Sequence, residues 1–436
     1  MVDSATRMST MARIPAENTL TISHVRDSAE LAERLSLGTS AEGMEKFQAL
    51  VVRRLHFNEE TCEKVKEALK KREESNKSWK KLELRNIDGD ITAAISTCVA
   101  IDATQEVKLV ANNTEISNEG WMAICEGLRC NSILQRLRIT TTLEGTGLQL
   151  FVEGLHHASV LQILDFSWST FENDDAVEAL TLGLRRNCSL TELHLMGCCL
   201  KDEHVAWIVG GLRDHPTLEC LDLNGNKCGQ ASSFALAELV SHNTHLRKLD
   251  LSFQTGNERL TISLLVEALH RNCTLRTLDL SNCRLDDEDV IILGRMLCEC
   301  KHISELFIAR NKITDMGISA LARMLPNIRS LRRLSLWGNP FDDQGAQALA
   351  LGMSQNCEIE DVDLFRNFFC SDKILLYTHL NRAGRRLLLT EQPIPLGVWP
   401  LVLSRANEFK FQKASSATTS DLIFHLIRGP ALFESR

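Results

Sequence analysis

The chain has 436 residues, of which 44% are hydrophobic and 24% charged, with a formal net charge of −8. No apolar run approaches the ~20 residues that a membrane-spanning helix needs, so we expect no membrane span. Residues 79–368 carry 27 basic and 39 acidic side chains, whereas residues 369–436 carry nine basic and five acidic ones. The acidic middle argues against nucleic acid as the main ligand, because phosphate contacts need a cationic surface.

The first part of the chain precedes any clear repeat. Residues 1–28 are polar and lack periodicity, so we expect a disordered tail without a signal peptide. Residues 29–78 predict helices at 29–37, 41–55 and 61–71. We expect these helices to form an N-terminal cap that shields the open end of the first repeat.

A nine-residue pattern, L-x-x-L-x-L-x-x-N/C, recurs every 27 to 30 residues between residues 79 and 368. Clear copies begin at Leu190, Leu218, Leu246, Leu275, Ile303, Leu331 and Ile359. Weaker copies begin at Thr104, Leu134 and Leu161, and a degenerate copy begins at Trp79. A fixed period of this length predicts a leucine-rich-repeat solenoid. We expect an α/β horseshoe of about ten to eleven repeats, with a parallel sheet on its concave face and helices on its convex face.

Each repeat combines two apolar periods. Leu278 and Leu280 alternate with polar residues, which predicts a strand, and a helical stripe follows at Val290, Leu293, Met296 and Leu297. The ninth position should hydrogen-bond the turning backbone; it is occupied by Asn112, Cys198, Asn226, Gln254, Cys283, Asn311, Asn339 and Asn367. Four positions later stand residues that we expect to be helix N-caps, namely Asp202, Asp287, Asp315 and Asp343.

Asn and Cys share the ninth position, and an Asn-Cys loop recurs at Asn187-Cys188, Asn272-Cys273 and Asn356-Cys357. In these features residues 79–368 resemble the ribonuclease-inhibitor-like leucine-rich-repeat superfamily. That superfamily includes ribonuclease inhibitors, Ran GTPase-activating proteins and the repeat domains of NOD-like receptors. The resemblance implies the fold, but members of one fold serve unrelated functions, so no contact residue is carried over.

Residues 369–436 predict a helical C-terminal cap, with helices at 374–389, at 396–406 around Trp399 and at 421–428. A second interpretation stays open. The stretch Tyr377–Ala383, followed by Pro393-Ile-Pro395, resembles a SOCS box, the element that docks repeat proteins onto ubiquitin-ligase adaptors. Tyr377, Asn381 and Arg385 depart from that pattern, and burying Asn and Arg in an apolar docking groove is costly.

The sequence contains no G-x-x-x-x-G-K-[ST], H-E-x-x-H or G-x-S-x-G motif, so we expect no catalytic residue and no cofactor. His156-His157, Cys198-Cys199 and Cys298-x-Cys300 lack zinc spacing, so we expect no metal. Fifteen cysteines without a C-x-x-C pair suggest free thiols in a reducing compartment, the cytoplasm or the nucleus. We expect one buried position shared by Cys188, Cys273 and Cys357.

The concave face is the candidate binding site, because the third, fifth and seventh residues of each strand point away from the core. The fifth position carries Asp165, His194, Asp222, Asp250 and Asp279. These carboxylates either repel one another until a basic partner binds or form a solvated row of consensus residues. Later strands carry aromatic and arginine residues, which either form an interface or are covered by the cap: Phe307, Trp337 and Phe365, with Arg310, Arg333 and Arg366.

The sequence therefore predicts a monomeric, non-enzymatic scaffold that binds one or more proteins on its concave face. The first alternative is a regulator of a small GTPase, similar to the Ran GTPase activators. Those proteins carry an acidic tail, whereas this C-terminal region is basic. The second alternative is a substrate-recognition subunit of a ubiquitin ligase, through the SOCS-box-like segment.

Overall fold

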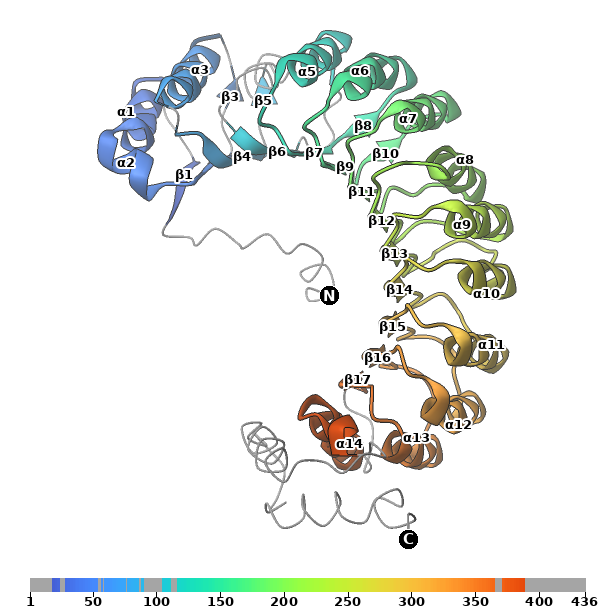
Figure 1. Cartoon of the computed structure of the whole chain (residues 1–436). Helices are drawn as coiled ribbons and strands as arrows, with labels where there is room; N and C mark the ends of the chain where they lie inside the picture. Colours follow the sequence, from blue (N-terminus) through green and yellow to red (C-terminus); the bar gives the residue numbers. More distant parts are fainter. Residues whose placement is uncertain are drawn as a thin grey trace. The chain divides into compact units, whose positions relative to one another are not determined.

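The computed structural model describes residues 18–23, 28–53, 56–57, 59–75, 77–85, 88–89, 104–110, 116–364 and 371–388. The chain forms two compact units. The first comprises Met1–Leu200 and Asp214–Leu218, and the second comprises Lys201–Arg213 and Glu219–Arg436. In each unit, parallel strands line one side and helices line the other (Figure 1). The predicted α/β repeat architecture is confirmed in both units.

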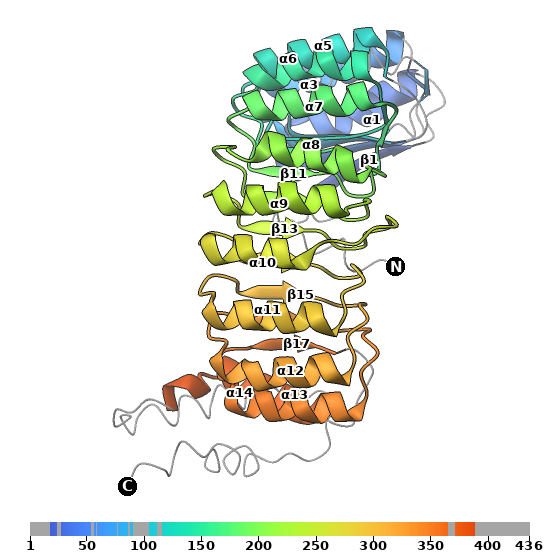
Figure 2. The ribbon, with the colours of Figure 1, turned by 90° about the vertical axis from the view of Figure 1, so that its right-hand side faces the viewer.

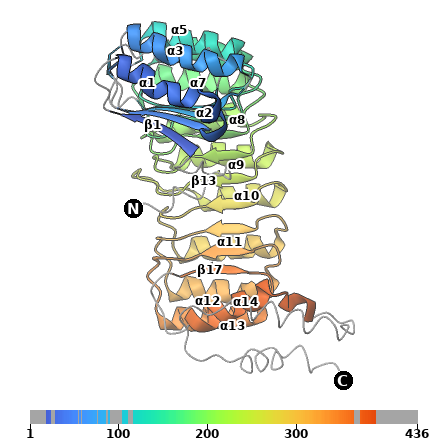
Figure 3. The ribbon, with the colours of Figure 1, turned by 90° about the vertical axis from the view of Figure 1, so that its left-hand side faces the viewer.

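In the first unit the main sheet runs in the order β1-β2-β4-β6-β7-β9-β11, and every pairing is parallel. Its strands are β1 (Thr19–Ser23), β2 (Ala49–Arg53), β4 (Trp79–Arg85), β6 (Thr104–Val110), β7 (Arg136–Thr140), β9 (Ile163–Asp165) and β11 (Glu192–His194). Its helices are α1 (Ser28–Thr39), α2 (Ala41–Lys46), α3 (Glu59–Glu74), α5 (Asn118–Cys130), α6 (Gly145–His157) and α7 (Asp174–Arg186). Two short pairs, β3 (His56–Phe57) with β5 (Asp88–Gly89) and β8 (Thr142–Leu143) with β10 (Thr170–Phe171), lie apart from this sheet. Figure 3 shows α1, α2 and β1 at the edge of the main sheet of this unit.

In the second unit the strands pair in chain order from β12 to β17, again all parallel. They are β12 (Cys220–Asp222), β13 (Lys248–Asp250), β14 (Thr277–Asp279), β15 (Glu305–Phe307), β16 (Arg333–Ser335) and β17 (Asp361–Asp363). The helices are α8 (Asp202–Leu212), α9 (Gln230–His242), α10 (Ile262–Arg271), α11 (Asp287–Glu299), α12 (Asp315–Met324), α13 (Asp343–Gln355) and α14 (Ser371–Arg382). Figure 2 shows α8 to α13 stacked side by side. No helix in the described ranges is both long and apolar enough to cross a membrane.

The core of a repeat lies between its strand and its helix. Leu278 and Leu280 point inward from β14 and are fully buried. They pack with the apolar stripe of α11, which is buried at Val290, Leu293 and Met296. Because neither element can bury its apolar face alone, each repeat depends on its neighbours for a closed core.

The ninth position joins one repeat to the next through buried hydrogen bonds. The amide nitrogen of Asn311 donates to the carbonyl oxygens of Leu280 and Ile308, at 3.0 and 2.9 Å. Its amide oxygen accepts from the backbone N–H groups of Cys283 and Leu285, at 2.9 and 3.1 Å. The side chain therefore satisfies backbone groups of two adjacent repeats. Gln254, which departs from the pattern, makes equivalent bonds to Leu223, Leu251 and Cys228.

The helix caps differ from the prediction by one residue. The caps are Asp286, Thr314 and Asp342, so the aspartates that follow them begin their helices. The predicted caps Asp202, Asp287 and Asp315 reach the next repeat instead. Asp202, for example, accepts from the N–H groups of Gly229, Ala231 and Ser232 at the start of α9. In the same way, Asp315 accepts from Asp342 and Gly345 at the start of α13. Each such carboxylate meets the positive end of the following helix.

The Asn-Cys loops correct a second prediction. Asn187, Asn272 and Asn356 are the buried residues of these loops. Asn272 donates to the carbonyl oxygen of Val240 and accepts from the N–H of Leu275, which closes the turn before the strand. The cysteine that follows points outward: Cys188 and Cys273 are exposed, and Cys357 is half-buried. The expected shared buried position for these thiols is therefore wrong.

The structure also differs from the sequence analysis near the N-terminus. The expected helix at 41–55 is interrupted, since α2 ends at Lys46 and the apolar run that follows forms β2. Thr19–Ser23, expected to be disordered, forms β1 beside it. Arg72 of α3 is buried, stacks on Trp79 at 3.6 Å and donates to the carbonyl oxygens of Gly38 and Gly43. Carbonyl acceptors thus replace water around a buried cation.

The last described helix, α14, packs against the final repeat. Asn381 is buried, and its amide nitrogen donates to the carbonyl oxygens of Asn356 and Ile359, at 3.1 and 2.9 Å. Arg385 is also buried and donates to the carbonyl oxygen of Ser354. Phe365, Arg366 and Trp399 lie outside the described residues.

We predict that Asn311→Ala lowers the free energy of unfolding by about 2 kcal/mol or more, because it leaves buried backbone groups of two repeats without partners. Chemical and thermal melting of the purified chain measure this loss. Asn327→Ala is the matched control, since Asn327 is exposed. Equal stability of the two variants would show that the ninth-position bonds contribute little.

We also predict two classes of thiol. Burial raises the pKa of Cys228 to about 12 and raises the pKa of Cys198 and Cys283 well above the usual range. These thiols should resist alkylation until the chain unfolds, whereas Cys188 and Cys273 should react in the native state. Peptide mapping after native and denaturing alkylation separates the classes. Fewer than fifteen reactive thiols in the denatured, unreduced chain would indicate disulfides.

Candidate protein-binding surface

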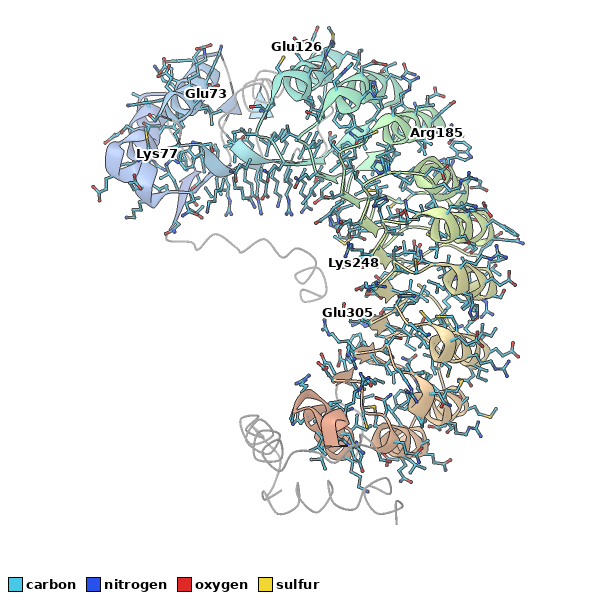
Figure 4. All side chains as sticks on the ribbon, in the orientation of Figure 1. Glu73, Lys77, Glu126, Arg185, Lys248 and Glu305 are labelled. Atoms are coloured by element: carbon cyan, nitrogen blue, oxygen red, sulfur yellow. The ribbon has the colours of Figure 1, made fainter. Side chains whose placement is uncertain are left out.

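The third, fifth and seventh residues of each repeat lie on the side of the strands away from the core, as the register predicts. Lys248 and Glu305, both third residues, extend from the strand side of the second unit, whereas Arg185 extends from a helix of the first unit (Figure 4). Neighbouring strands pair residue by residue, so equal positions form rows across the sheet. Such rows are the candidate binding residues of each unit.

Three of the predicted aspartates lie side by side in the second unit. Asp222, Asp250 and Asp279 are paired across β12, β13 and β14, and we call them the aspartate row. Asp222 and Asp250 are each only 3% exposed. Each member accepts the backbone N–H two residues ahead, at 2.9 to 3.0 Å, so its first role is to fix the end of its strand. The two buried aspartates therefore match neither alternative from the sequence, which were a solvated row and an open contact surface.

The aspartate row is electrostatically strained. Burial, followed by the charges of Asp279 and Asp222, raises the pKa of Asp250 to about 8. Burial also raises the pKa of Asp279. Ser252 offsets part of this strain, since its hydroxyl and its N–H both donate to Asp250. Asp165 belongs to the first unit instead, where Arg138 lies 3.4 Å from its carboxylate.

Four of the six predicted aromatic and arginine residues are described, and they lie together in the second unit: Phe307, Arg310, Arg333 and Trp337. The guanidinium of Arg310 stacks on the ring of Trp337, 3.9 Å from its centroid, and lies 5.8 Å from the ring of Phe253. Arg333 lies 5.6 Å from the ring of Phe307. Arg310 is exposed, and the three rings are half-buried. We call these five residues the aromatic–arginine surface.

The two arginines of this surface are held differently. Arg333 forms ion pairs with Glu305 at 3.1 Å and with Asp361 at 3.4 Å. Arg310 is held by its aromatic neighbours and lies against Gly338, where an added Cβ would approach its side chain to 3.1 Å. Arg310 therefore presents its donors to solvent while its orientation is fixed by stacking.

Sequence reasoning missed Phe253, and a conformational signal explains why it belongs here. Phe253 and Arg310 occupy the eighth position of their repeats, where the backbone has a positive φ, 60° and 54°. Gly225 and Gly338 occupy the same position in other repeats, with φ of 71° and 72°. A left-handed conformation costs a non-glycine residue about 1–2 kcal/mol. Aligning the repeats on this eighth position would have brought Phe253 and Arg310 into one row.

A second missed feature lies in the first unit. The weak repeats at Trp79, Thr104 and Leu134 share the register of the clear ones, and their solvent-facing positions are rich in Lys and Arg. The predicted binding residues begin only at Asp165, so they do not include these positions. Among the described residues, no group of three or more His, Cys, Asp or Glu side chains is arranged to hold a metal ion.

We predict that Asp250→Asn stabilises the chain more at pH 9 than at pH 5. In the folded state the raised pKa of Asp250 makes it bind more protons than in the unfolded state between about pH 4 and pH 8, so stability falls as pH rises through this window. The amide keeps an acceptor for Ser252 and carries no charge. Melting temperatures of both proteins at the two pH values measure the difference. Asp363→Asn, at the exposed fifth position of β17, is the control. An equal effect of Asp250→Asn on the melting temperature at both pH values would contradict the prediction.

Comparison with known proteins adds independent findings. A family model described as "Leucine Rich repeat" matches residues 186–203, 242–253, 271–293, 299–322 and 327–350. The chain is 33% identical over 189 residues to "NACHT, LRR and PYD domains-containing protein 12" of Mus musculus, a match that covers 42% of this chain and 18% of that protein. It is 28% identical over 211 residues to "Ribonuclease inhibitor" of Mus musculus, with 48% of this chain and 46% of that protein covered.

Among solved structures, one chain of the complex titled "Crystal structure of Rad7 and Elc1 complex in yeast" is similar at 16% identity and a TM-score of 0.44, with 78% of this chain and 77% of that chain covered. Each of the two mouse relatives is matched over less than half of its own length. The matched repeats, the relatives and the parallel α/β architecture agree. The chain thus contains leucine-rich repeats and is similar to proteins of the ribonuclease-inhibitor-like superfamily.

Proposed function

We propose that this chain is a non-enzymatic scaffold that binds a protein partner through the aromatic–arginine surface of its second unit. The repeat family supports a role in protein interaction. Aromatic and Arg side chains are enriched among the residues that contribute most to protein binding. A rigid sheet presents them with little ordering cost, because the strands are fixed by the core before any partner arrives.

The observation that carries the proposal is the backbone conformation of Arg310. Its φ of 54° is unfavourable for any side chain with a Cβ, and glycine serves in the equivalent turns at Gly225 and Gly338. The strained residue carries a guanidinium that stacks on the ring of Trp337 and is exposed. Strained conformations of this kind are typical of residues retained for function rather than for folding.

The fold supports this surface from both sides. The partners of Arg333 are Glu305 on β15 and Asp361 on β17, and Arg382 of α14 lies 3.3 Å from Asp361. The end of the second unit therefore stabilises the orientation of Arg333 beside Phe307. The buried bonds of Asn381 and Arg385 to the last repeat favour a C-terminal cap over a SOCS-box-like docking element. The alternative function is regulation of a small GTPase, and under that alternative the partner is the GTPase itself.

We predict that Arg310→Gly and Trp337→Ala each weaken partner binding by about 2 kcal/mol or more. Arg310→Gly should leave the melting temperature unchanged or raise it, because glycine relieves the strained φ. Affinity purification with the wild-type chain, followed by mass spectrometry, identifies the partner, and titration with the purified partner measures the loss for each variant.

Trp207→Ala is the matched control. Trp207 lies on α8 in the same unit, is 44% exposed and stacks on His204, away from the strand face. It removes the same side chain without touching the aromatic–arginine surface. Retention of the partner by Arg310→Gly and Trp337→Ala, at wild-type affinity, would refute the proposed surface. A loss of affinity that only follows a drop in melting temperature would assign these residues to folding instead.

A further inference from the structure

The strand side of the first unit carries a dense group of cations. One row across β4, β6 and β7 contains Lys81, Glu106 and Arg136. The next row contains Glu83, Lys108 and Arg138. Arg53 of β2 lies beside Arg85 of β4. All of these residues alternate with buried apolar ones, so they share the solvent-facing side of β2, β4, β6 and β7. We call the six basic residues the cationic face: Arg53, Lys81, Arg85, Lys108, Arg136 and Arg138.

The carboxylates among these cations are too few and lie too deep to neutralise them. Glu83 is approached by three cations at once, Lys81 at 3.3 Å, Lys108 at 3.4 Å and Arg85. Its side chain is only 5% exposed, whereas that of Arg85 is 41% exposed. Glu83 therefore lies below its cations, with the side chain of Arg85 on the outside.

The other two carboxylates repeat this arrangement. Glu106 is 17% exposed and lies 3.4 Å from Lys81, whose side chain is 28% exposed. Asp165 is 17% exposed and lies 3.4 Å from Arg138, which is 28% exposed. Arg53 is exposed at the edge of the group, with no ion pair to any residue that the structure describes. Among the residues that the structure describes here, six cations thus face three carboxylates.

The positive excess affects the side chains themselves. Burial, followed by the charges of Arg138, Arg85 and Lys81, lowers the pKa of Lys108 to about 8. Burial and the charge of Arg53 lower the pKa of Arg85 as well. Cations that depress one another's pKa values gain when an anion arrives, because the anion relieves their repulsion.

We propose that the cationic face of the first unit binds an acidic polypeptide segment. The inference goes beyond the aromatic–arginine surface, which belongs to the other unit, and rests on the proposed function only in taking a protein as the ligand. Guanidinium groups of Arg53, Arg85 and Arg138 suit carboxylates, which they bind through paired hydrogen bonds. Neighbouring strands are ~4.8 Å apart, and alternate side chains of an extended peptide are ~7 Å apart, so one segment can reach cations on several strands.

The same observations argue against nucleic acid as the ligand. A nucleic acid strand presents a phosphate at every residue and needs a continuous cationic track. On this face Glu106 separates Lys81 from Arg136 in one row, and Glu83 and Asp165 flank Lys108 and Arg138 in the next row. The whole chain is also acidic, with a net charge of −8. A peptide of mixed composition can place its carboxylates at the cations and smaller groups between them.

The test is fluorescence anisotropy with the full chain and a fluorescein-labelled ten-residue peptide of alternating Glu and Ser, at low salt. We expect saturable binding that weakens as salt rises, because the contacts are ionic. Arg53→Gln combined with Arg85→Gln should weaken binding by about tenfold or more. The matched control is Arg129→Gln combined with Arg185→Gln, which removes two exposed arginines from helices α5 and α7 and should leave binding unchanged. Circular dichroism and melting confirm that each variant is folded.

A second pair, Lys81→Gln with Arg136→Gln, replaces the first if that pair fails to fold, and should weaken binding to a similar extent. The absence of saturable peptide binding, or an equal loss in the control pair, would overturn the proposal. Tighter binding of a labelled decathymidylate that depends on the same residues would replace the peptide with nucleic acid. Arg310→Gly should leave peptide binding unchanged; an equal loss there would also overturn the assignment to this face. Failure of the peptide test leaves the aromatic–arginine surface untouched, since that surface is tested by partner retention.

Discussion

The buried amide bonds at the ninth position are the constraint on which the other features of each unit depend. A strand of three residues, such as β14, has too few backbone bonds to define its own ends. Asn311 supplies the missing partners, because it binds the carbonyl oxygens of Leu280 and Ile308 and the N–H groups of the neighbouring repeat. The register of adjacent strands is then fixed, and with it the identity of every side chain that faces solvent.

A fixed register turns a repeating sequence into rows of chemically similar side chains. Equal positions in successive repeats meet across the sheet, so an excess of one charge at such a position produces a local electrostatic field. In the first unit this bias brings Lys108 and Arg138 together, and in the second it brings Asp222 and Asp250 together. Lys81, Arg85 and Arg138 are more exposed than the carboxylates that they pair with, whereas Asp222 and Asp250 are buried and accept hydrogen bonds from the turns. One architecture therefore exposes cations in one unit and buries carboxylates in the other.

Periodicity was sufficient to predict the repeats, since the alternation of Leu278 and Leu280 and the stripe of α11 need no long-range information. It failed where one apolar run suits two structures: Ala49–Arg53 continues a helical pattern but pairs as β2. It also failed between neighbours, because Asn272 takes the buried position that we had assigned to Cys273. Exposure of the candidate binding residues could not be predicted at all. The depth of Asp250 and the stacking of Arg310 depend on side chains from other repeats, which the sequence does not place.

The eighth position has a consequence for how such a surface can change over evolutionary time. Its residue begins the turn that leaves the sheet, with a positive φ whether it is Gly225, Phe253, Asn282, Arg310 or Gly338. Any side chain other than glycine pays a similar local penalty there, and the penalty does not reach the leucines of the core. Recognition chemistry can therefore be exchanged at this one position, repeat by repeat, while the framework beneath it is inherited unchanged.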